Sequence, residues 1–471
     1  MIASKIGRTF LKAYNQKYDK EYSAKEFFVE VYWEIVYNHS LYLMSGGNSP
    51  FENPKISWKK GDRPSLENRQ ERLKKMITKI ESEIADASNV IGFPASIEKE
   101  YGPTSGNVTD IDFDISFDDK YLSWIGGSLG ITMAGGLSVL FDNSKVLLAT
   151  FEGWIKYREL LNDKSVEKLA GNKINSWNGQ WLNFYFDEDY YNHPDFSSLT
   201  DEGFFGEGLG ADKGFVVIKT IKWSRLFFNL SRKLANQTLT GYMYSLGQTN
   251  KTIGFIPFRF SEAESISQTY KKLFGDFDAL EQQNDYELLM GKTIREACKL
   301  GSIGIQALEP KGLIEYFTDK SKILKFTKSA KIKGSESEED FVFRDQKTKK
   351  KRYEELITFR TYKIWLITMI TKNKEEDLTY SSEIAIKLSE FRKLDKEKSS
   401  TKRGNLLNEL FKSGNKKMFL SNLTEILKSE KDDKKEYLKE LRNRVHLMNS
   451  EDFGYFATLL KFDYAYQQKE N

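Results

Sequence analysis

The sequence predicts an α+β protein in which a mixed N-terminal domain, residues 1–263, is followed by an all-helical bundle, residues 264–471. Two observations lead to this prediction. Segments with the alternating apolar pattern of strands occur before residue 263 and almost vanish after it. In the second half, apolar residues recur every three or four positions, as on one face of a helix. A chain of 471 residues is long enough for two or three domains with cores of their own.

Composition indicates a folded protein whose charge excess is local. Aromatic residues make up 14% of the chain and apolar residues 39%, with only 8 prolines. Because the net charge is only +4, a nucleic-acid surface would have to be confined to part of the chain. The single cysteine, Cys298, is expected to be buried and fits a reducing cytoplasm. The N-terminus lacks signal-peptide features, and no apolar run is long enough to span a membrane.

The first elements are predicted to be helical. Apolar residues within residues 1–44 keep helical spacing, and a charged helix follows at about Leu66–Ala87. The glycine-rich stretch Leu122–Asn143 is expected to allow close packing under a helix such as Gly135–Phe141. The next segment, Val146–Leu161, is expected to form a strand followed by a helix.

An acidic strand is the one candidate for metal chemistry. Asp110, Asp112 and Asp114 alternate with apolar residues, so their carboxylates share one face. A metal-dependent nuclease built on them is the alternative, enzymatic hypothesis. No calcium-loop pattern completes the site, so a solvated strand face is the preferred interpretation. No other pattern of a hydrolase, zinc protease or phosphate-binding loop is present, and we expect no catalysis, metal or cofactor.

The stretch Thr238–Phe260 predicts a β-hairpin. Its strands are expected at Tyr242–Leu246 and Ile253–Phe258, with Gly247 in the connection. The tip combines amides, a hydroxyl and an ammonium group, which suits the reading of base edges, although these are also ordinary turn residues. The candidate tip residues are Gln248, Thr249, Asn250 and Lys251.

A predicted basic helix, Trp223–Ala235, leads into the hairpin and is suited to hold phosphates beside it. Arg225 and Arg232 are seven residues apart and therefore share a face of the helix. A solvated helix face is the alternative interpretation. The candidate residues are Lys222, Arg225, Arg232 and Lys233, with Asn236 and Gln237 at the helix end.

The helical bundle carries one charged insertion, predicted at residues 331–352. It ends in QKTKKKR, whose basic residues would give non-specific grip on a nucleic-acid strand. A solvated loop is the simpler interpretation. The basic residues are Lys347, Lys349, Lys350, Lys351 and Arg352.

Several segments, taken in order, resemble one family. They are GNSPF at Gly47–Phe51, the region Ile97–Gly106, the LSWIGG…LFDN stretch, LLATFEGW and SLGQTNKTIGFIPF. The order is similar to that of the large subunit of a type I CRISPR surveillance complex (Cascade), on the type I-B side of that group. The helical domain is similar only in kind. Relatives often carry two CxxC pairs of a zinc ribbon, which this chain lacks, so no zinc is expected.

The resemblance implies a non-catalytic cytoplasmic protein that recognises a protospacer-adjacent motif, starts strand opening and supports the displaced strand. It implies as partners a guide RNA, double-stranded target DNA, the backbone, 5′-handle-binding and small subunits of the complex, and a separate helicase–nuclease that cuts. The hairpin tip would then read the motif and the basic helix would hold phosphates. An unrelated nucleic-acid-binding scaffold remains the other alternative.

Overall fold

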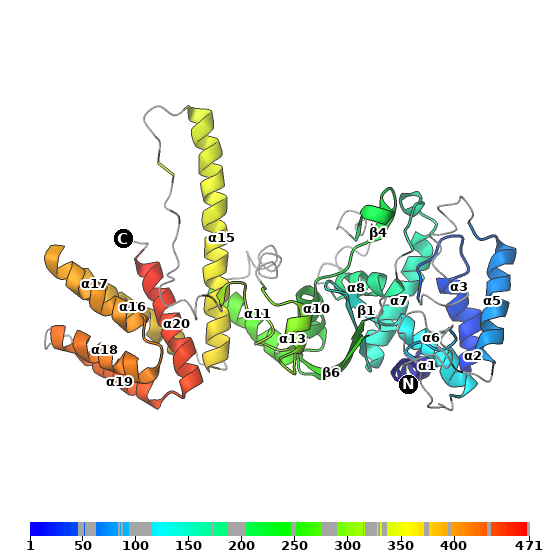
Figure 1. Cartoon of the computed structure of the whole chain (residues 1–471), viewed down its shortest axis with the longest axis horizontal. Coiled ribbons are helices and arrows are strands. Elements are labelled where there is room, and N and C mark those ends of the chain that lie inside the picture. The colour runs from blue at the N-terminus through cyan, green and yellow to red at the C-terminus, as the bar shows by residue number, and fades with distance from the viewer. Residues whose placement is uncertain are drawn as a thin grey trace. The chain divides into compact units, whose positions relative to one another are not determined.

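The structure is a computed structural model of the chain, and it divides into two compact units (Figure 1). Unit 1 comprises Met1–Ser261 and Thr293–Gly304, and unit 2 comprises Glu262–Lys292 and Ile305–Asn471. Unit 1 holds the sheets and unit 2 is helical, which confirms the α+β fold class. The described residues are 1–45, 51, 63–82, 85, 88–93, 115–171, 173–186, 204–245, 251–274, 290–313, 315, 327, 330–331, 337–371, 376–393, 397–430 and 435–468.

Unit 1 begins with helices, as predicted, and several start at side-chain caps. Ser23 accepts a hydrogen bond from the Glu26 amide and Ser65 from the Asn68 amide, so each satisfies an otherwise unpaired backbone donor. The helices are α1 (Ile2–Tyr18), α2 (Ala24–Phe27) continuing through η1 (Phe28–Tyr32) into α3 (Trp33–Val36), α5 (Leu66–Ile80), α6 (Phe117–Ser128), α7 (Ser144–Leu160) and α8 (Ile174–Tyr185).

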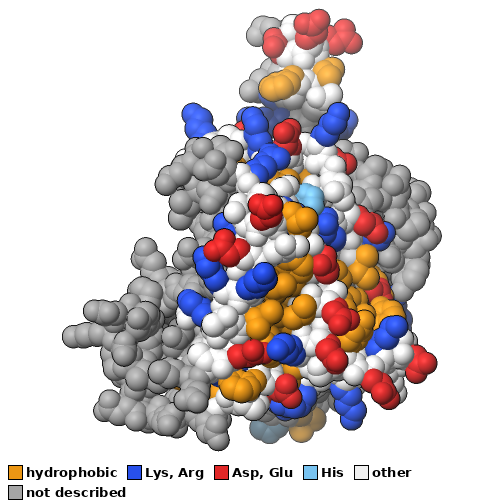
Figure 2. Space-filling model, turned by 90° about the vertical axis from the view of Figure 1, so that its right-hand side faces the viewer, with side chains coloured by type: hydrophobic (Ala, Val, Ile, Leu, Met, Phe, Trp, Pro, Cys, Tyr) orange, Lys and Arg blue, Asp and Glu red, His pale blue; other side chains and the backbone are white. Residues whose placement is uncertain are grey.

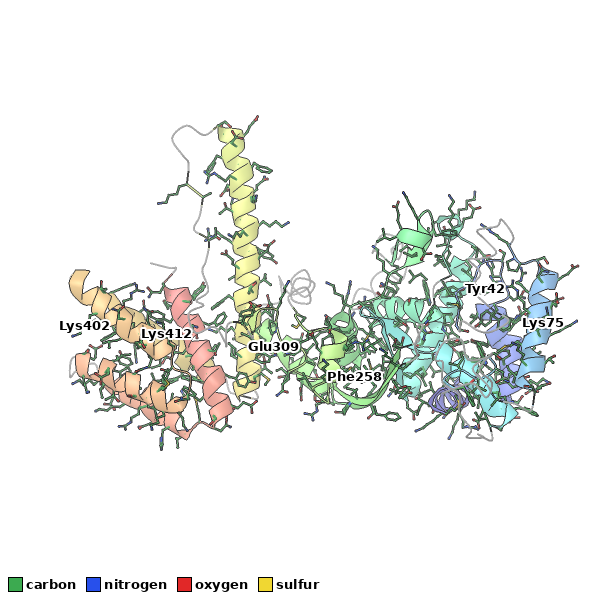
Figure 3. All side chains as sticks on the ribbon, in the orientation of Figure 1. Tyr42, Lys75, Phe258, Glu309, Lys402 and Lys412 are labelled. Atoms are coloured by element: carbon green, nitrogen blue, oxygen red, sulfur yellow. The ribbon has the colours of Figure 1, made fainter. Side chains whose placement is uncertain are left out.

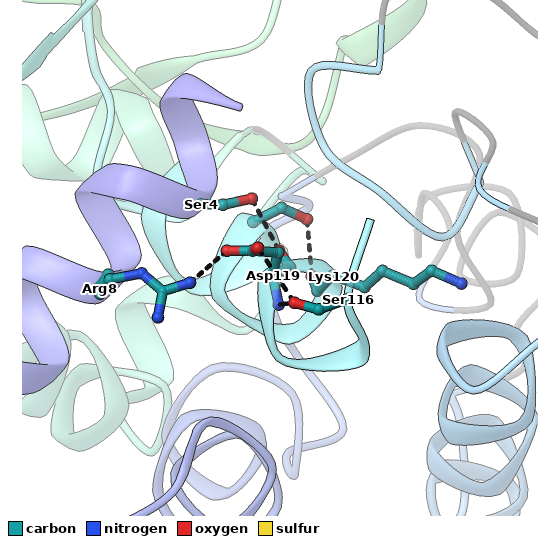
Figure 4. Close-up of polar contacts among 6 residues, drawn as sticks. Ser4, Arg8, Ser116, Asp119 and Lys120 are labelled. Atoms are coloured by element: carbon teal, nitrogen blue, oxygen red, sulfur yellow. Dashed lines mark hydrogen bonds and ion pairs between the residues drawn. The ribbon is translucent and has the colours of Figure 1, made fainter. Parts of the chain in front are cut away.

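Polar contacts tie α1 to the first turn of α6. The Ser4 hydroxyl donates to the Asp119 carbonyl at 2.7 Å, and the Arg8 guanidinium donates to the Asp119 carboxylate at 2.5 Å (Figure 4). Ser116 caps α6 by accepting from the Asp119 amide. The N-terminal helix is therefore fixed to the body of unit 1 by both the backbone and the side chain of the same aspartate.

The core between α7 and α8 is rich in tryptophan. The indole N–H of Trp177 donates to the Gly153 carbonyl, and that of Trp181 donates to the Ala149 carbonyl, both at 2.8 Å. These bonds remove the penalty of burying the indole nitrogens. The predicted strand in Val146–Leu161 is wrong, because α7 covers the whole apolar run. A continuous apolar run is compatible with a buried helix as well as with a strand.

Four antiparallel strands form the main sheet, in the order β1-β2-β5-β6. They are β1 (Ile131–Met133), β2 (Leu137–Phe141), β5 (Thr238–Ser245) and β6 (Lys251–Arg259). The predicted helix Gly135–Phe141 is wrong. Gly135 and Gly136 have φ angles of 104° and 75°, a conformation that turns β1 tightly into β2.

Four further strands and helices belong to the described part of unit 1. The strands β3 (Phe205–Glu207) and β4 (Val216–Ile218) form a separate two-stranded sheet. Helix α10 (Trp223–Lys233) immediately precedes β5, and the short α13 (Ile294–Cys298) holds the cysteine. Cys298 is buried as expected, and desolvation raises the pKa of its thiol to about 11.

Unit 2 is a helical bundle as predicted. Its polar centre is an ion pair between Lys363 and Asp463, 2.7 Å apart, with Ser382 hydrogen-bonded to both groups. The Lys363 ammonium lies 5.9 Å from the centroid of the Phe359 ring, which in turn packs on Phe462 with centroids 5.8 Å apart. The helices are α11 (Phe260–Phe274), α15 (Glu338–Thr371), α16 (Glu376–Lys393), α17 (Glu397–Phe411), α18 (Lys416–Ser429), α19 (Glu436–Leu447) and α20 (Ser450–Gln467).

The charged insertion is not a separate loop. Residues 338–352 form the first part of α15, which runs without a break for 34 residues. Acidic residues occupy its first turn, where they interact favourably with the helix dipole. The basic residues predicted for the insertion therefore lie on a helix and not in a loop. This part of α15 extends beyond the other helices of unit 2 (Figure 1).

Candidate nucleic-acid interface

One continuous segment of unit 1 contains no acidic residue. From residue 213 to residue 261, 49 positions include no Asp or Glu, whereas the average of 68 acidic residues in 471 predicts about seven. The segment has eight basic residues: Lys213, Lys219, Lys222, Arg225, Arg232, Lys233, Lys251 and Arg259. Because the whole chain has a net charge of +4, the remaining residues together carry a net charge of −4. The charge excess is therefore concentrated in the segment that forms β4, α10, β5 and β6.

Helix α10 has its basic residues on its least buried side, and all three are partly buried. Eight of its 11 residues are buried, and the other three are Arg225, Arg232 and Lys233. Lys222 is exposed at the N-cap position. The basic residues of the predicted helix thus form a narrow edge, and the rest of α10 belongs to the core. The predicted residues Asn236 and Gln237 are exposed in the short connection between α10 and β5.

The predicted hairpin is present as β5 and β6, which pair antiparallel from Thr238–Arg259 to Ser245–Lys251. The strands are longer than predicted. Lys251, the last of the four tip candidates, is exposed at the start of β6. The other three, Gln248, Thr249 and Asn250, lie outside the described residues.

Aromatic packing anchors one face of the hairpin. Phe258, labelled in Figure 3, lies 4.9 Å from Phe141 of β2 and 6.2 Å from Phe227 of α10, measured between ring centroids. Phe260 lies 5.3 Å from Phe227 and is fully buried. Gly241 of β5 leaves the room that these rings need, because a Cβ there would lie 2.7 Å from the Phe258 ring. The hairpin and α10 are therefore held together as one structural element.

The opposite face of the hairpin carries two aromatic residues that the sequence reasoning missed. Tyr242 of β5 pairs with Phe255 of β6, and the ring centroids are 5.3 Å apart. Phe255 is 59% exposed. No local signal marks Phe255 as exposed, because only the register of β6 with β5 determines the face on which it lies.

A second basic surface lies in unit 2. Lys347, Lys349, Lys350 and Lys351 are exposed on α15, and Arg352 is partly buried. Lys349 pairs with Asp345 at 2.8 Å. Arg344 on the same helix donates to the Lys331 carbonyl. All five predicted basic residues thus belong to the part of α15 that extends from the bundle.

Not every surface is basic. Figure 2 shows the end of unit 1 that carries α5, where acidic and basic side chains are mixed around a strip of hydrophobic side chains. Arginines there have structural partners: Arg158 donates to the Asn38 carbonyl at 3.1 Å and Arg69 to the Asn38 side chain at 3.0 Å. These residues cap the end of α3.

The acidic candidates for metal binding, Asp110, Asp112 and Asp114, lie outside the described residues. Within the part of the chain that is described, no group of three or more His, Cys, Asp or Glu side chains could hold a metal ion. In the same part, no helix is both long enough and apolar enough to cross a membrane. Comparisons of the chain with known protein families, with curated proteins and with solved structures find no match.

Proposed function

We propose that this chain is a non-catalytic nucleic-acid-binding protein that acts through α10 and the β5–β6 hairpin. The observation that supports this most directly is the acid-free segment 213–261, whose eight basic residues stand in a chain that is otherwise net negative. Phosphate backbones bind to such local positive surfaces, and the attraction is independent of base sequence. The attachment of the β5–β6 strands to α10 keeps the phosphate-binding edge at a fixed position relative to these strands.

As the specific form of this function, we propose the large subunit of a type I CRISPR surveillance complex. Its support is the ordered resemblance of the segments between Gly47 and Phe258. In this role the tip, Gln248–Lys251, reads a protospacer-adjacent motif in duplex DNA while Arg225, Arg232 and Lys233 hold the backbone. Amide side chains suit this task, because they donate to and accept from base edges.

The proposed role needs no catalysis by this chain. Replacing DNA pairs by guide RNA–DNA pairs is nearly balanced in free energy, at about 1.4 kcal/mol per base-pair step, so the protein only has to start the opening. The proposed partners are the guide RNA, the double-stranded target, the other subunits and a separate helicase–nuclease. The proposed location is the cytoplasm, where the single cysteine stays reduced.

A tagged purification from the native cell tests the proposal. We expect short RNAs of uniform length with a common 5′ end, together with several further proteins. In the purified assembly, replacing Gln248 and Asn250 by Ala should weaken binding of motif-containing duplexes while the assembly still forms. If neither RNA nor protein copurifies, the assignment to a surveillance complex is overturned. Metal-dependent DNA cleavage that is lost in Asp112→Ala would overturn the non-catalytic role.

A further inference from the structure

The hairpin has one buried and one open face. Strand alternation and the register of β5 and β6 place a single set of side chains on the open face. The set is Thr238, Thr240, Tyr242 and Tyr244 on β5, with Thr252, Phe255, Pro257 and Arg259 on β6. Five of these residues are exposed, Tyr242 and Pro257 are partly buried, and Tyr244 is buried. In Figure 1, β6 runs along the lower margin of the sheet, with α10 and α13 on its upper side.

A β-bulge completes this face. Met243 pairs with Gly254 and Tyr244 with Thr252, so Ile253 is the extra residue. Gly254 has a φ of 111°, a conformation that other residues rarely adopt. Without the bulge, alternation would direct Thr252 to the buried face. With it, the Thr252 hydroxyl lies 3.0 Å from the Tyr242 hydroxyl.

The aromatic rings on this face are ordered from the inside outward. Tyr244 is buried, and its hydroxyl lies 3.2 Å from the Asn175 amide nitrogen. Its ring stacks on that of Tyr242, with centroids 5.8 Å apart and planes 23° apart. Tyr242 in turn contacts Phe255. The outermost ring is therefore supported by two others, although it is itself in water.

A single exposed apolar residue is ordinary on a protein surface. The open face differs because the exposed ring of Phe255 lies on a strand that is paired with its neighbour. Tyr242 and Pro257 lie on the same face, together with three threonine hydroxyls. No carboxylate side chain occurs in the sequence of the two strands or of the surrounding acid-free segment, and Lys251 and Arg259 lie at the two ends of β6. A flat aromatic surface flanked by cations suits a ligand with planar apolar rings and negative charges.

We propose that Tyr242 and Phe255 form a stacking platform for unpaired bases of a single-stranded nucleic acid. The inference rests on the proposed function, in which this hairpin contacts nucleic acid. It adds that the bound nucleic acid is single-stranded. Bases within a duplex are stacked on one another and offer only their edges, whereas an unpaired base has a free face. Lys251 and Arg259 are eight residues apart along β6, about 26 Å in an extended strand, which accommodates several nucleotides.

The test uses the full-length protein and fluorescently labelled oligonucleotides of equal length, measured by anisotropy at low salt. One is a single-stranded oligothymidylate, the second has the same backbone with abasic sites, and the third is a duplex. We expect Phe255→Ala to weaken binding of oligothymidylate by about 5- to 150-fold, the range for loss of one stacked base. Phe255→Tyr should retain binding. Phe117→Ala, which removes another exposed phenylalanine of unit 1, is the matched control.

The abasic oligonucleotide keeps the test decisive even if a variant misfolds. Wild-type protein should bind it more weakly than oligothymidylate, and this difference should disappear in Phe255→Ala. Equal affinity of the wild type for the two single strands would overturn the stacking platform and leave the proposed function standing. If the wild type binds none of the three ligands, the proposed function itself fails.

Discussion

Gly7 of α1 and Gly126 of α6 lie against each other where the two helices cross. A Cβ at Gly126 would lie 2.0 Å from the Ala3 carbonyl oxygen and 2.5 Å from the Gly7 amide nitrogen. A Cβ at Gly7 would lie 2.1 Å from the Leu122 carbonyl oxygen. The two backbones are therefore in direct contact, and neither position has room for a side chain.

Replacement of Gly126 by Ala should consequently force α1 and α6 apart. We expect a loss of about 3 kcal/mol in the free energy of unfolding, at the upper end of what overpacking costs. The matched control is Gly454→Ala in α20, where no atom lies within 4 Å of the added Cβ. This change should stabilise by up to about 1 kcal/mol, since alanine is the better helix former. Thermal unfolding followed by circular dichroism measures both, and shifts of the same sign would contradict the explanation.

The buried pair Lys363–Asp463 predicts a strong dependence on both partners. Side chains of Lys363 and Asp463 are only 12% and 4% exposed. Lys363→Met leaves a buried carboxylate without its cation, and we expect a loss of about 3–5 kcal/mol in unfolding free energy. Adding Asp463→Leu removes the unpaired carboxylate and should restore most of the lost unfolding free energy. Calorimetric unfolding of the wild type, the single variant and the double variant checks this. A double variant no more stable than the single one would exclude uncompensated charge as the cause.

His39 predicts a pH-dependent contribution to stability. Nδ1 of His39 lies 3.0 Å from the Leu41 amide nitrogen and 3.1 Å from the Leu41 carbonyl oxygen, and Nε2 lies 3.3 Å from the Asn162 side-chain oxygen. Desolvation, followed by the charge of nearby Arg158, lowers the pKa of His39 below 6.5. As the pH falls from about 7, the unfolded chain binds this proton first, so unfolding free energy decreases.

The measurement for His39 is denaturant unfolding between about pH 7 and pH 5.5, above the range in which carboxylates titrate. We expect His39→Gln to flatten the decrease in stability, because glutamine does not titrate. An unchanged slope in His39→Gln would assign the pH dependence to other groups.

The basic run of α15 predicts a salt-dependent contribution to nucleic-acid binding. Lys347, Lys350 and Lys351 are three and four residues apart and therefore share a helix face. Changing all three to Glu should weaken binding. It should also reduce the slope of log affinity against log salt concentration by about 0.7 to 0.9 for each phosphate that the variant no longer neutralises.

The same change of net charge can be made elsewhere in unit 2. Lys402, Lys412 and Lys417 are exposed, and the first two are labelled in Figure 3. Their replacement by Glu should change the slope less than the α15 variant does. Equal slopes for the two triple variants would show that net charge, and not the position of the α15 residues, controls binding.

Short sequence patterns correctly predicted the elements that are determined by neighbouring residues along the chain. The hairpin and α10 follow from strand alternation, turn residues and helical spacing, and the bundle follows from apolar periodicity. In Val146–Leu161, the apolar run Val146–Phe151 is buried except for the partly buried Leu148, so it lacks the alternation that separates a strand from a helix. The Gly135–Gly136 pair was itself a turn signal between two short strands. Phe255 could not be identified as exposed from the sequence, because its neighbours Ile253 and Pro257 are also apolar and only the register with β5 determines the face.

Cys298 has a practical consequence. Because the only thiol of the chain is buried and its pKa is raised to about 11, very little of it is thiolate at neutral pH, and alkylating reagents react with thiolate. Labelling of an introduced cysteine therefore does not require removal of Cys298 first. A cysteine introduced at exposed Thr240 on the open face, or at Phe343 on α15, would accept a single spin label or fluorophore. Each surface could then report its own contact with a ligand, without any other change to the protein.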